Sequence, residues 1–437
     1  MVNQFYSTPS IDPLHRLNVR DGLEVNAERW ELAHRYHKHR QNIHYQSLNE
    51  PGIVCGLGIQ IIEAPQTSRA NLHKQGRWLK IQPGIAIDIE GNPIIVDENK
   101  SIDRSFPFVS PRISNKNFDE EITVYLVVSY VDSRRLTDEE YWKTDKERWK
   151  EREWFRFDQQ LEPPNERQIE LCRIKLLVED IALDRFELKK PQNVFNPRLN
   201  EIDLRYRPSA KAKPQALVNI ATTAVESYNP RFPTSNINHN LTCLMQSLDA
   251  LYPSLQGNTE VVNINLEETF NLENIDLLHI PFGQIQNLYR SSNNDGKYFL
   301  NSYWEKGGVI LIEADSKIEG NSQNITSDIN SLFKSLDKNY VYLKEWGSDD
   351  LDKEDSLKNQ PFLFTALPLT KLILSIYYSP GIIVVHGNLS DAWGGKSKRY
   401  EENLSRDDIR TAHELGINML YFAYRRRKMM GLIDSDI

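Results

Sequence analysis

Residues 297–315 read KYFLNSYWEKGGVILIEAD, and this stretch indicates the fold of the second half of the chain. Its first part has the composition of a helix that ends at the glycine pair Gly307 and Gly308. Its second part is a near-continuous run of valine, isoleucine and leucine, which is typical of a strand covered by helices on both faces. The stretch therefore predicts a helix that leads into a buried parallel strand.

Helices and strands alternate in the same way throughout residues 236–437. This alternation predicts a mainly parallel, doubly wound sheet, so the C-terminal domain is expected to be of the α/β class. The predicted helices cover residues 238–253, 297–308, 327–336 and 408–430, and the predicted strands cover residues 260–266, 275–283, 308–315 and 381–387. Ser405 and Asp408 cap the last helix.

Residues 1–186 have a different pattern, which predicts a β-rich module with one long helix. The helix is expected over residues 25–49, with Asn26 as its cap and Pro51 and Gly52 after its end. A second, charged helix is expected over residues 137–155. Short strands are expected at residues 52–63, 78–82, 84–96, 121–132 and 167–180, and a turn at residues 90–92 divides the third of them.

Proline and basic residues are frequent between residues 187 and 235. This composition predicts a linker or an extended decoration between the two domains, with one short helix near residues 215–226. Residues 1–20 are expected to form an extended arm. The chain is thus predicted to be a multidomain protein of the α+β and α/β classes.

The composition excludes several classes of protein. The net charge of -8 gives no general basic surface, so nucleic-acid binding is not expected. The N-terminus lacks the layout of a signal peptide, and no stretch reaches the roughly 18 apolar residues of a membrane span. Cys55, Cys172 and Cys243 lie far apart in apolar settings, so free buried thiols in a reducing compartment are expected. These features predict a soluble, cytoplasmic protein.

A resemblance to a known module covers residues 14–131. The motifs that carry it are LNVRDGL (17–23), RYHKHR (35–40), PGIVCGL (51–57), PGIAIDIEGNPIIV (83–96) and VYLVVSY (124–130). In this order they resemble an N-terminal module of bacterial proteins associated with contractile injection systems, the phage-tail-like particles. The resemblance implies a baseplate-associated component of such an assembly, and it implies no reaction.

A second resemblance covers residues 237–430. Its motifs are LLHIPFGQ (277–284), YFLNSYWEKGGVILIEAD (298–315), SPGIIVVHGNLSDAW (379–393) and RTAHELGINMLYFAY (410–424). Together they resemble the DUF4159 family of uncharacterised domains, which look like relatives of the class I glutamine amidotransferases. The resemblance implies the doubly wound fold of those enzymes.

The amidotransferase resemblance also indicates where chemistry would lie. Such an enzyme needs a cysteine on the tight turn between a strand and a helix, and a histidine base positioned by an acid. The corresponding turn carries Gln284, so the resemblance implies a catalytically empty domain. His386 and Asp391 are interpreted either as a remnant of the base–acid pair or as part of a polar loop that holds the domain's shape. Ser390 is a weaker candidate for a substitute nucleophile.

Trp30, Trp78 and Trp393 are the candidate anchors for a protein partner, because a few large aromatic side chains dominate many protein interfaces. Trp393 stands in NLSDAWGG (388–395), where a tryptophan that fills the core is the alternative. The basic run of residues 425–428 has two interpretations. It complements the macrodipole at the end of a helix, or it contacts an acidic neighbour or anionic lipid head groups.

These features predict a non-enzymatic structural subunit of a contractile injection particle, at its baseplate or at an extension of the baseplate. The expected partners are other baseplate, tail-fibre, sheath or tube proteins and further copies of the chain. Two alternatives stay open: a module that binds a ligand or a membrane surface, and a hydrolase or amidotransferase relative. No catalytic or cofactor-binding residue is assigned. His34 and His37 are neighbours on the first helix but lack the third ligand that a metal site needs.

Overall fold

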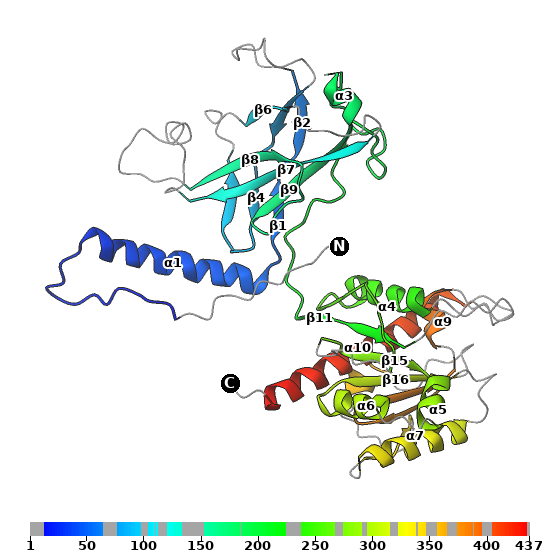
Figure 1. Ribbon diagram of the computed structural model, residues 1–437. Helices are drawn as coiled ribbons and strands as arrows, with labels where there is room; N and C mark the ends of the chain where they lie inside the picture. Colours follow the sequence, from blue (N-terminus) through cyan, green and yellow to red (C-terminus); the bar gives the residue numbers. More distant parts are fainter. Residues whose placement is uncertain are drawn as a thin grey trace. The chain divides into compact units, whose positions relative to one another are not determined.

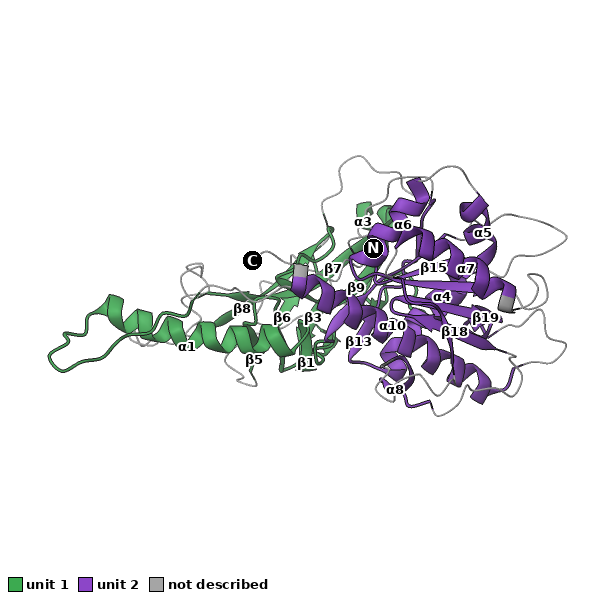
Figure 2. Cartoon of the chain, turned by 90° about the horizontal axis from the view of Figure 1, so that it is seen from below, with its two compact units in different colours: residues 1–213 green, residues 214–437 purple. Residues whose placement is uncertain are grey.

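The structure is a computed structural model in which the chain divides into two compact units, residues 1–213 and 214–437 (Figure 2). Each unit has its own buried core. The described residues are 13–63, 77–97, 104–109, 111, 120–132, 153–183, 185–223, 237–266, 274–290, 295–314, 322–337, 340–346, 356–364, 374–387, 389–395 and 404–434.

The first described element is the helix α1 (Ala27–Leu48), which confirms the helix predicted over residues 25–49. The Asn26 side chain accepts a hydrogen bond from the backbone N–H of Arg29 at 2.9 Å, so Asn26 caps the helix as its residue type predicts. None of the helix residues is buried. The N-terminal half of α1 projects beyond the strands of its unit (Figure 1).

The described strands of the N-terminal unit form antiparallel sheets of order β1-β4-β5, β2-β3-β6 and β10-β9-β7-β8. The long strands β7 and β9 pair at the centre of the third sheet, and one core gathers buried residues from all three sheets. The elements are β1 (Gly52–Gly56), β2 (Ile59–Ile62), β3 (Trp78–Ile81), β4 (Gly84–Ile87), β5 (Pro93–Val96), β6 (Ser105–Pro107), β7 (Glu121–Val131), β8 (Trp154–Gln160), β9 (Gln168–Leu177), α3 (Val178–Ala182) and β10 (Ile202–Asp203).

The hairpin of β4 and β5 turns at residues 88–92, which confirms the turn predicted there. Gly91 has a φ of 78°, a left-handed conformation that costs glycine little. A Cβ atom at this position would clash with the backbone oxygen of Asn42 in α1, so the helix passes closely over the turn. The Asp88 carboxylate accepts hydrogen bonds from the backbone and side-chain N–H groups of Asn92 at 2.8 and 2.9 Å, which fixes the shape of the turn.

Two predictions for the middle of the chain need correction. The charged helix predicted over residues 137–155 falls largely outside the described residues, but Trp154 and Phe155 begin the strand β8 and are not helical. The segment 187–235, predicted as a linker or an extended decoration, is not a linker up to residue 213, and its mostly irregular backbone there fits the decoration. Its residues up to 213 belong to the N-terminal unit, where the Ile53 N–H donates to the Pro208 carbonyl at 2.8 Å.

The described part of the segment 215–226 contains strands in place of the short helix predicted there. Residues 216–222 form β11 (Ala216–Val218) and β12 (Ile220–Thr222), the first strands of the C-terminal unit. Val218, Ile220 and Ala221 are all buried. A strand that is covered on both faces can bury all of its apolar residues. The burial of these three residues therefore favours a strand over the predicted helix.

The C-terminal unit is built on a seven-stranded sheet of order β14-β12-β15-β16-β19-β18-β17. The strands from β14 to β19 are parallel, which confirms the prediction of a mainly parallel sheet. β18 is absent from the predicted strands; it pairs antiparallel with β19 and makes the sheet mixed. The strands are β13 (Leu255–Gly257), which pairs with β11, and β14 (Val262–Asn263), β15 (Leu277–Pro281), β16 (Val309–Ala314), β17 (Lys344–Glu345), β18 (Ser375–Ser379) and β19 (Ile382–His386).

Helices cover both faces of this sheet (Figure 1). One core combines residues of α4, α9 and α10 with Leu277 and Leu311 of the sheet. The other combines residues of α5, α6 and α7 with Leu278 and Ile310. Neighbouring residues of one strand thus point to opposite apolar faces, which explains the continuous apolar runs. The helices are α4 (Ile237–Leu251), α5 (Phe282–Arg290), α6 (Asp295–Glu305), α7 (Ser322–Leu336), α8 (Ser356–Asn359), α9 (Leu389–Trp393) and α10 (Arg406–Asp434).

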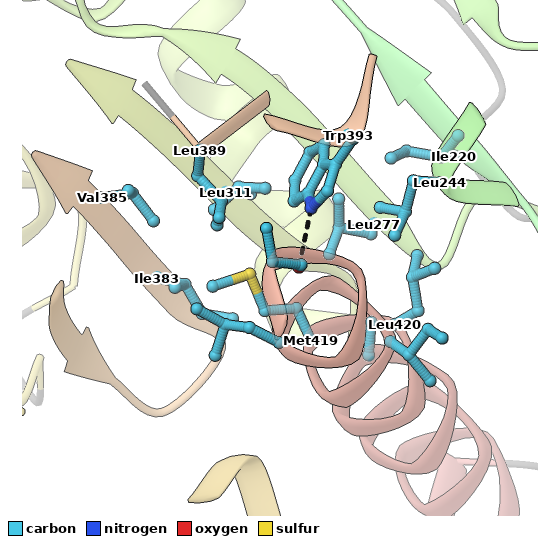
Figure 3. Packing of buried hydrophobic residues seen from close by; sticks show 14 of the residues in the cluster. Ile220, Leu244, Leu277, Leu311, Ile383, Val385, Leu389, Trp393, Met419 and Leu420 are labelled. Carbon is cyan, nitrogen blue, oxygen red and sulfur yellow. Dashed lines mark hydrogen bonds between the residues drawn. The ribbon is translucent and has the colours of Figure 1, made fainter. Parts of the chain in front are cut away.

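Trp393 fills the core beneath α10 (Figure 3). Its side chain is 2% exposed, and its indole N–H donates to the backbone carbonyl of Ala412 at 2.9 Å. A Cβ atom on Gly416 would lie 3.0 Å from the indole and 2.6 Å from Leu244 Cδ1. The glycine of the LGIN motif therefore allows α10 to approach the indole closely.

Asn418, in the same motif, is a fully buried polar residue whose amide is hydrogen-bonded at both ends. Its Nδ2 donates to the carbonyls of Leu357 and Phe362 at 3.0 and 2.7 Å. Its Oδ1 accepts from the Phe362 N–H at 2.9 Å. This one side chain therefore joins α10 to α8 and to the segment that follows α8. Its hydrogen bonds satisfy an amide that is buried away from water.

The basic run of residues 425–428 lies within α10 and partly binds the unit's own backbone. Arg426 Nη1 donates to the carbonyls of Trp304 and Gly308 at 2.9 and 2.7 Å, and Arg427 Nη1 donates to the carbonyl of Ile275. These two guanidinium groups have a structural role that neither sequence interpretation anticipated. In the part of the chain that the structure describes, no helix combines the length and the apolar composition needed to cross a membrane.

Asp276 precedes β15 and lies in the electrostatic field of Arg427. It is 7% exposed and accepts a hydrogen bond from the backbone N–H of Asn219 at 2.8 Å. Burial raises the pKa of Asp276 to about 6, although the hydrogen bond from Asn219 and the charge of Arg427 both act to lower it. Above that pH the folded chain must hold a charged carboxylate in a site that disfavours the charge.

We expect Asp276→Asn to change the pH dependence of stability. The carboxyl pKa is about 6 in the folded chain and about 3.9 in an unfolded one, so the wild type loses stability as the pH rises from about 4 to about 6. Asparagine keeps an acceptor oxygen and does not titrate. The unfolding free energy of the variant minus that of the wild type should therefore rise by about 2–3 kcal/mol over this range, at about 1.4 kcal/mol per pKa unit. Urea unfolding across the range measures this, and a constant difference contradicts the prediction.

Candidate functional site

Polar side chains gather toward the carboxyl ends of the central parallel strands of the C-terminal unit. Thr222 ends β12, His279 lies on β15, Glu313 lies on β16 and His386 ends β19. Because these strands are parallel, their carboxyl ends form one edge of the sheet, and open α/β sheets bind their ligands outside that edge. This edge is therefore the candidate functional site of the unit.

Three of these side chains form a hydrogen-bonded chain across neighbouring strands. His279 Nδ1 lies 2.9 Å from Thr222 Oγ1, and His279 Nε2 lies 3.2 Å from Glu313 Oε2. The other carboxylate oxygen of Glu313 accepts a hydrogen bond from the backbone N–H of Ser390 at 2.8 Å. The order of hydroxyl, imidazole and carboxylate is similar to that of a catalytic triad.

The hydroxyl and the imidazole of this hydrogen-bonded chain are closed off from solvent, whereas the Glu313 side chain is 12% exposed. Thr222 and His279 are 0% exposed, and all residues of α9, which supplies the Ser390 N–H, are buried. A nucleophile must be able to reach its substrate, and the Thr222 hydroxyl cannot do so in this arrangement. The chain instead joins β12, β15, β16 and α9 through a satisfied polar network.

The pKa of Glu313 shows how strongly the network acts on this carboxylate. Burial raises the pKa of Glu313, but the hydrogen bond and charge of His279 and the hydrogen bonds from Ser390 outweigh burial, so the pKa lies below its ordinary value. Glu313 is therefore ionised inside the protein. A buried carboxylate is tolerated only while its donors are in place, which makes His279 essential to the stability of this edge.

His386 and Asp391, considered as a base–acid pair, lie against opposite faces of the sheet. Successive side chains of β19 point to opposite faces of the sheet, so His386 is on the same face as Ile382 and Val384. Those two residues belong to the core of α5, α6 and α7. Asp391 lies on α9, with Asn240 Nδ2 of α4 at 3.5 Å from its Oδ1. The Nε2 atom of His386 is buried and has no hydrogen-bond partner among the residues that the structure describes.

The turn after β15 carries a structural side chain where the amidotransferase resemblance expects a nucleophile. α5 begins directly after β15, and Gln284 Nε2 donates to the backbone carbonyl of Thr223 at 2.5 Å. Gln284 thereby ties the end of β12 to α5. Cys243 lies on the helix α4, where its sulfur is 3.6 Å from His239 Nε2.

All three cysteines are free, as predicted, but the prediction that all are buried is wrong for two of them. Cys172 is buried, and burial raises the pKa of its thiol far above the ordinary value. Cys243 is half-buried. Cys55 is exposed, because it lies in the edge strand β1 beside a register shift in the pairing with β4.

The three tryptophans predicted as interface anchors have different environments. Trp78 is 6% exposed and Trp393 is 2% exposed. Trp78 fills the interior of its unit, which contradicts its prediction as an anchor, whereas the burial of Trp393 agrees with the alternative of a tryptophan that fills the core. Trp30 is 59% exposed on α1 and is the member of the three that is available to a partner.

Trp30 belongs to a line of exposed side chains along α1, which we call the α1 stripe. At 3.6 residues per turn, positions spaced by four and three residues in alternation lie on one face of a helix. The members of the α1 stripe have this spacing and are all exposed: Trp30, His34, His37, Gln41, His44 and Leu48. The stripe is the second candidate site.

The other sides of α1 face its own unit. Lys38 Nζ lies 2.7 Å from Tyr130 Oη, and Asn42 Nδ2 donates to Asn92 Oδ1 at 2.9 Å. Residues 13–15, which precede the helix, line a cavity of about 440 Å³ together with Leu32, Tyr36 and other residues of α1. These contacts leave the α1 stripe as the uncovered face.

A second cavity of about 440 Å³ in the same unit is lined by charged residues. Its charges neutralise one another: Arg167 Nη2 lies 2.6 Å from Glu90 Oε1, and Lys38 Nζ lies 3.4 Å from Asp132 Oδ2. A cavity of this composition has no excess of either charge to select a ligand. Among the described residues, no group of three or more histidine, cysteine, aspartate or glutamate side chains could hold a metal ion.

Comparison with known proteins gives no relative: no family model matches the chain, and no curated protein matches it. The function is therefore inferred from the residues and from their geometry.

Proposed function

We propose that the chain is a non-enzymatic structural subunit of a contractile, phage-tail-like injection particle, at the baseplate or at an extension of it. The observation that carries the proposal is α1, a helix of 22 residues without one buried side chain. Most helices in proteins gain their stability by packing an apolar face against the rest of the fold. Its own unit covers one side of α1 only partly and leaves the other side exposed, and we expect another subunit to cover the exposed side.

Two further observations support this function. The motifs of residues 14–131 resemble a module associated with contractile injection systems, and β1, β4 and β5 carry two of those motifs. In the C-terminal unit, Thr222 and His279 are buried and only the Glu313 side chain of the hydrogen-bonded chain is partly exposed, which suits a scaffold better than an enzyme. We infer that this unit is a building block that has kept the fold of the glutamine amidotransferases without their reaction.

One observation favours a second function, the binding of a small ligand at the carboxyl edge of the sheet. His386 Nε2 is buried at this edge without a hydrogen-bond partner. Native proteins seldom leave such atoms unsatisfied, and a ligand acceptor would complete the hydrogen bond. A ligand found in contact with His386 in an experimental structure would favour this function over a purely structural one.

Co-purification tests the proposed function. A tagged full-length chain produced in its native cells should sediment with sheath and tube proteins when intact particles are isolated, and it should stay with them through a second gradient. A chain that remains in the light fractions as a monomer, while particles form normally, would contradict the proposal.

A further inference from the structure

We propose that the α1 stripe binds an acidic amphipathic helix of a different subunit. The inference rests on the proposed function, which requires a partner, and it adds the surface and the chemistry of that partner.

The spacing of the α1 stripe identifies the kind of element that it fits. The intervals from Trp30 to Leu48 are four, three, four, three and four residues. This is the spacing of the a and d positions of a heptad repeat, along which a partner helix can lie. The four inner positions are histidine or glutamine, so the contact there would be polar. Trp30 and Leu48, at the two ends, are 59% and 53% exposed, so each offers an apolar side chain to anchor the partner.

The helix is held so that the stripe is presented in a fixed orientation. Lys38, Asn42 and Gln46 bind the body of the N-terminal unit, with Gln46 Nε2 donating to the Glu90 carbonyl at 2.6 Å. These residues lie to one side of the stripe, so a partner on the stripe would leave their hydrogen bonds intact. A surface that is already ordered before binding lowers the entropic cost of binding.

The charges beside the stripe favour an acidic partner. Arg40 is exposed next to the stripe, and among the described residues no carboxylate forms an ion pair with it. The neighbouring imidazoles of His37 and His44 can donate hydrogen bonds to carboxylates. A partner helix with glutamate or aspartate beside its own a and d positions would therefore complement the charge along the α1 stripe.

The same charges disfavour a second copy of the chain as the occupant. Two α1 helices that pair through the stripe would bring two Arg40 side chains to the same interface. Like charges placed together cost binding free energy, so a different subunit with the opposite charge is selected.

Binding of two designed peptides to the full-length chain tests the chemistry of the stripe. Both are heptad helices with leucine at a and d; one has glutamate at e and g, and the other has lysine. The acidic peptide should bind, and the double substitution Trp30→Ser with Arg40→Glu should weaken it by about tenfold or more, which corresponds to about 1.4 kcal/mol. Arg35→Glu is the control: it makes the same charge change on α1 away from the stripe, where it also breaks the ion pair with Glu31 at 3.5 Å, and it should change affinity less than about threefold. Equal binding of both peptides, or equal weakening by both variants, would overturn the inference.

Photo-crosslinking in isolated particles separates this inference from the proposed function. A crosslinking residue in place of His37 should join a segment of another subunit that is rich in glutamate and aspartate and has apolar residues three and four apart. If the chain is present in the particles but position 37 crosslinks to a second copy, to lipid or to nothing, the inference fails and the proposed function stands. If the chain is absent from the particles, both fail.

Discussion

Replacing His279 with alanine is expected to lower the unfolding free energy of the C-terminal unit by about 3–5 kcal/mol. The variant leaves the carboxylate of Glu313 without the imidazole that offsets its desolvation, and it removes the hydrogen bond between the imidazole and the Thr222 hydroxyl. Hydrogen exchange of peptides from β15 and β16 in the full-length chain measures the loss in this unit alone.

His386→Ala is the matched control, because it removes the same side chain from the same edge of the sheet. His386 Nε2 has no partner to lose, so the change should stay within about 1 kcal/mol. The double substitution His279→Leu with Glu313→Met should recover much of the stability, because it removes both members of the buried pair. Equal effects of His279→Ala and His386→Ala would show that the network does not stabilise the edge.

Trp393→Ala is expected to destabilise the same unit by about 3–5 kcal/mol through the loss of a large buried side chain and the cavity that it leaves. The indole fills the space between α9 and α10, and its N–H is bonded to the Ala412 carbonyl. Hydrogen exchange of α10 peptides measures the effect.

Trp30→Ala provides the comparison, since Trp30 is exposed and contacts only the His34 ring among the aromatic residues described. Its effect on the unfolding free energy should stay within about 0.5 kcal/mol, whereas its effect on partner binding should be large. A stability loss at Trp30 that matches the loss at Trp393 would contradict the assignment of one tryptophan to the core and the other to an interface.

Much of the fold follows from patterns in the sequence. Apolar runs such as GIIVVHG predict buried strands because both faces of the sheet are covered, and Ser405 with Asp408 marks the start of α10 by a capping interaction at 2.6 Å. Residues 216–222 were harder to predict, because the nearby prolines suggested a linker and only burial on both faces shows the strand. β18 was missed for a related reason: its sequence SIYYS is short and half-polar.

The candidate site was harder to predict than the fold. Hydrogen bonds between Thr222, His279 and Glu313 join residues that lie far apart in the sequence, so no local pattern shows them. A signal does exist: His279 and Glu313 each interrupt an aliphatic run, LLHIP and VILIEA, and a polar residue inside a buried strand needs a partner. The α1 stripe could be read from its spacing, but its exposure depends on which side of α1 binds the unit.

The central proposal is that this chain builds part of a contractile particle. Density maps of isolated contractile particles, from cells with the chain and from cells in which it is deleted, test the claim most directly. The account predicts one defined density at the baseplate or its extension that is present in the first map and missing in the second, with α1 buried against a neighbouring helix. Identical maps from both kinds of cell would contradict it.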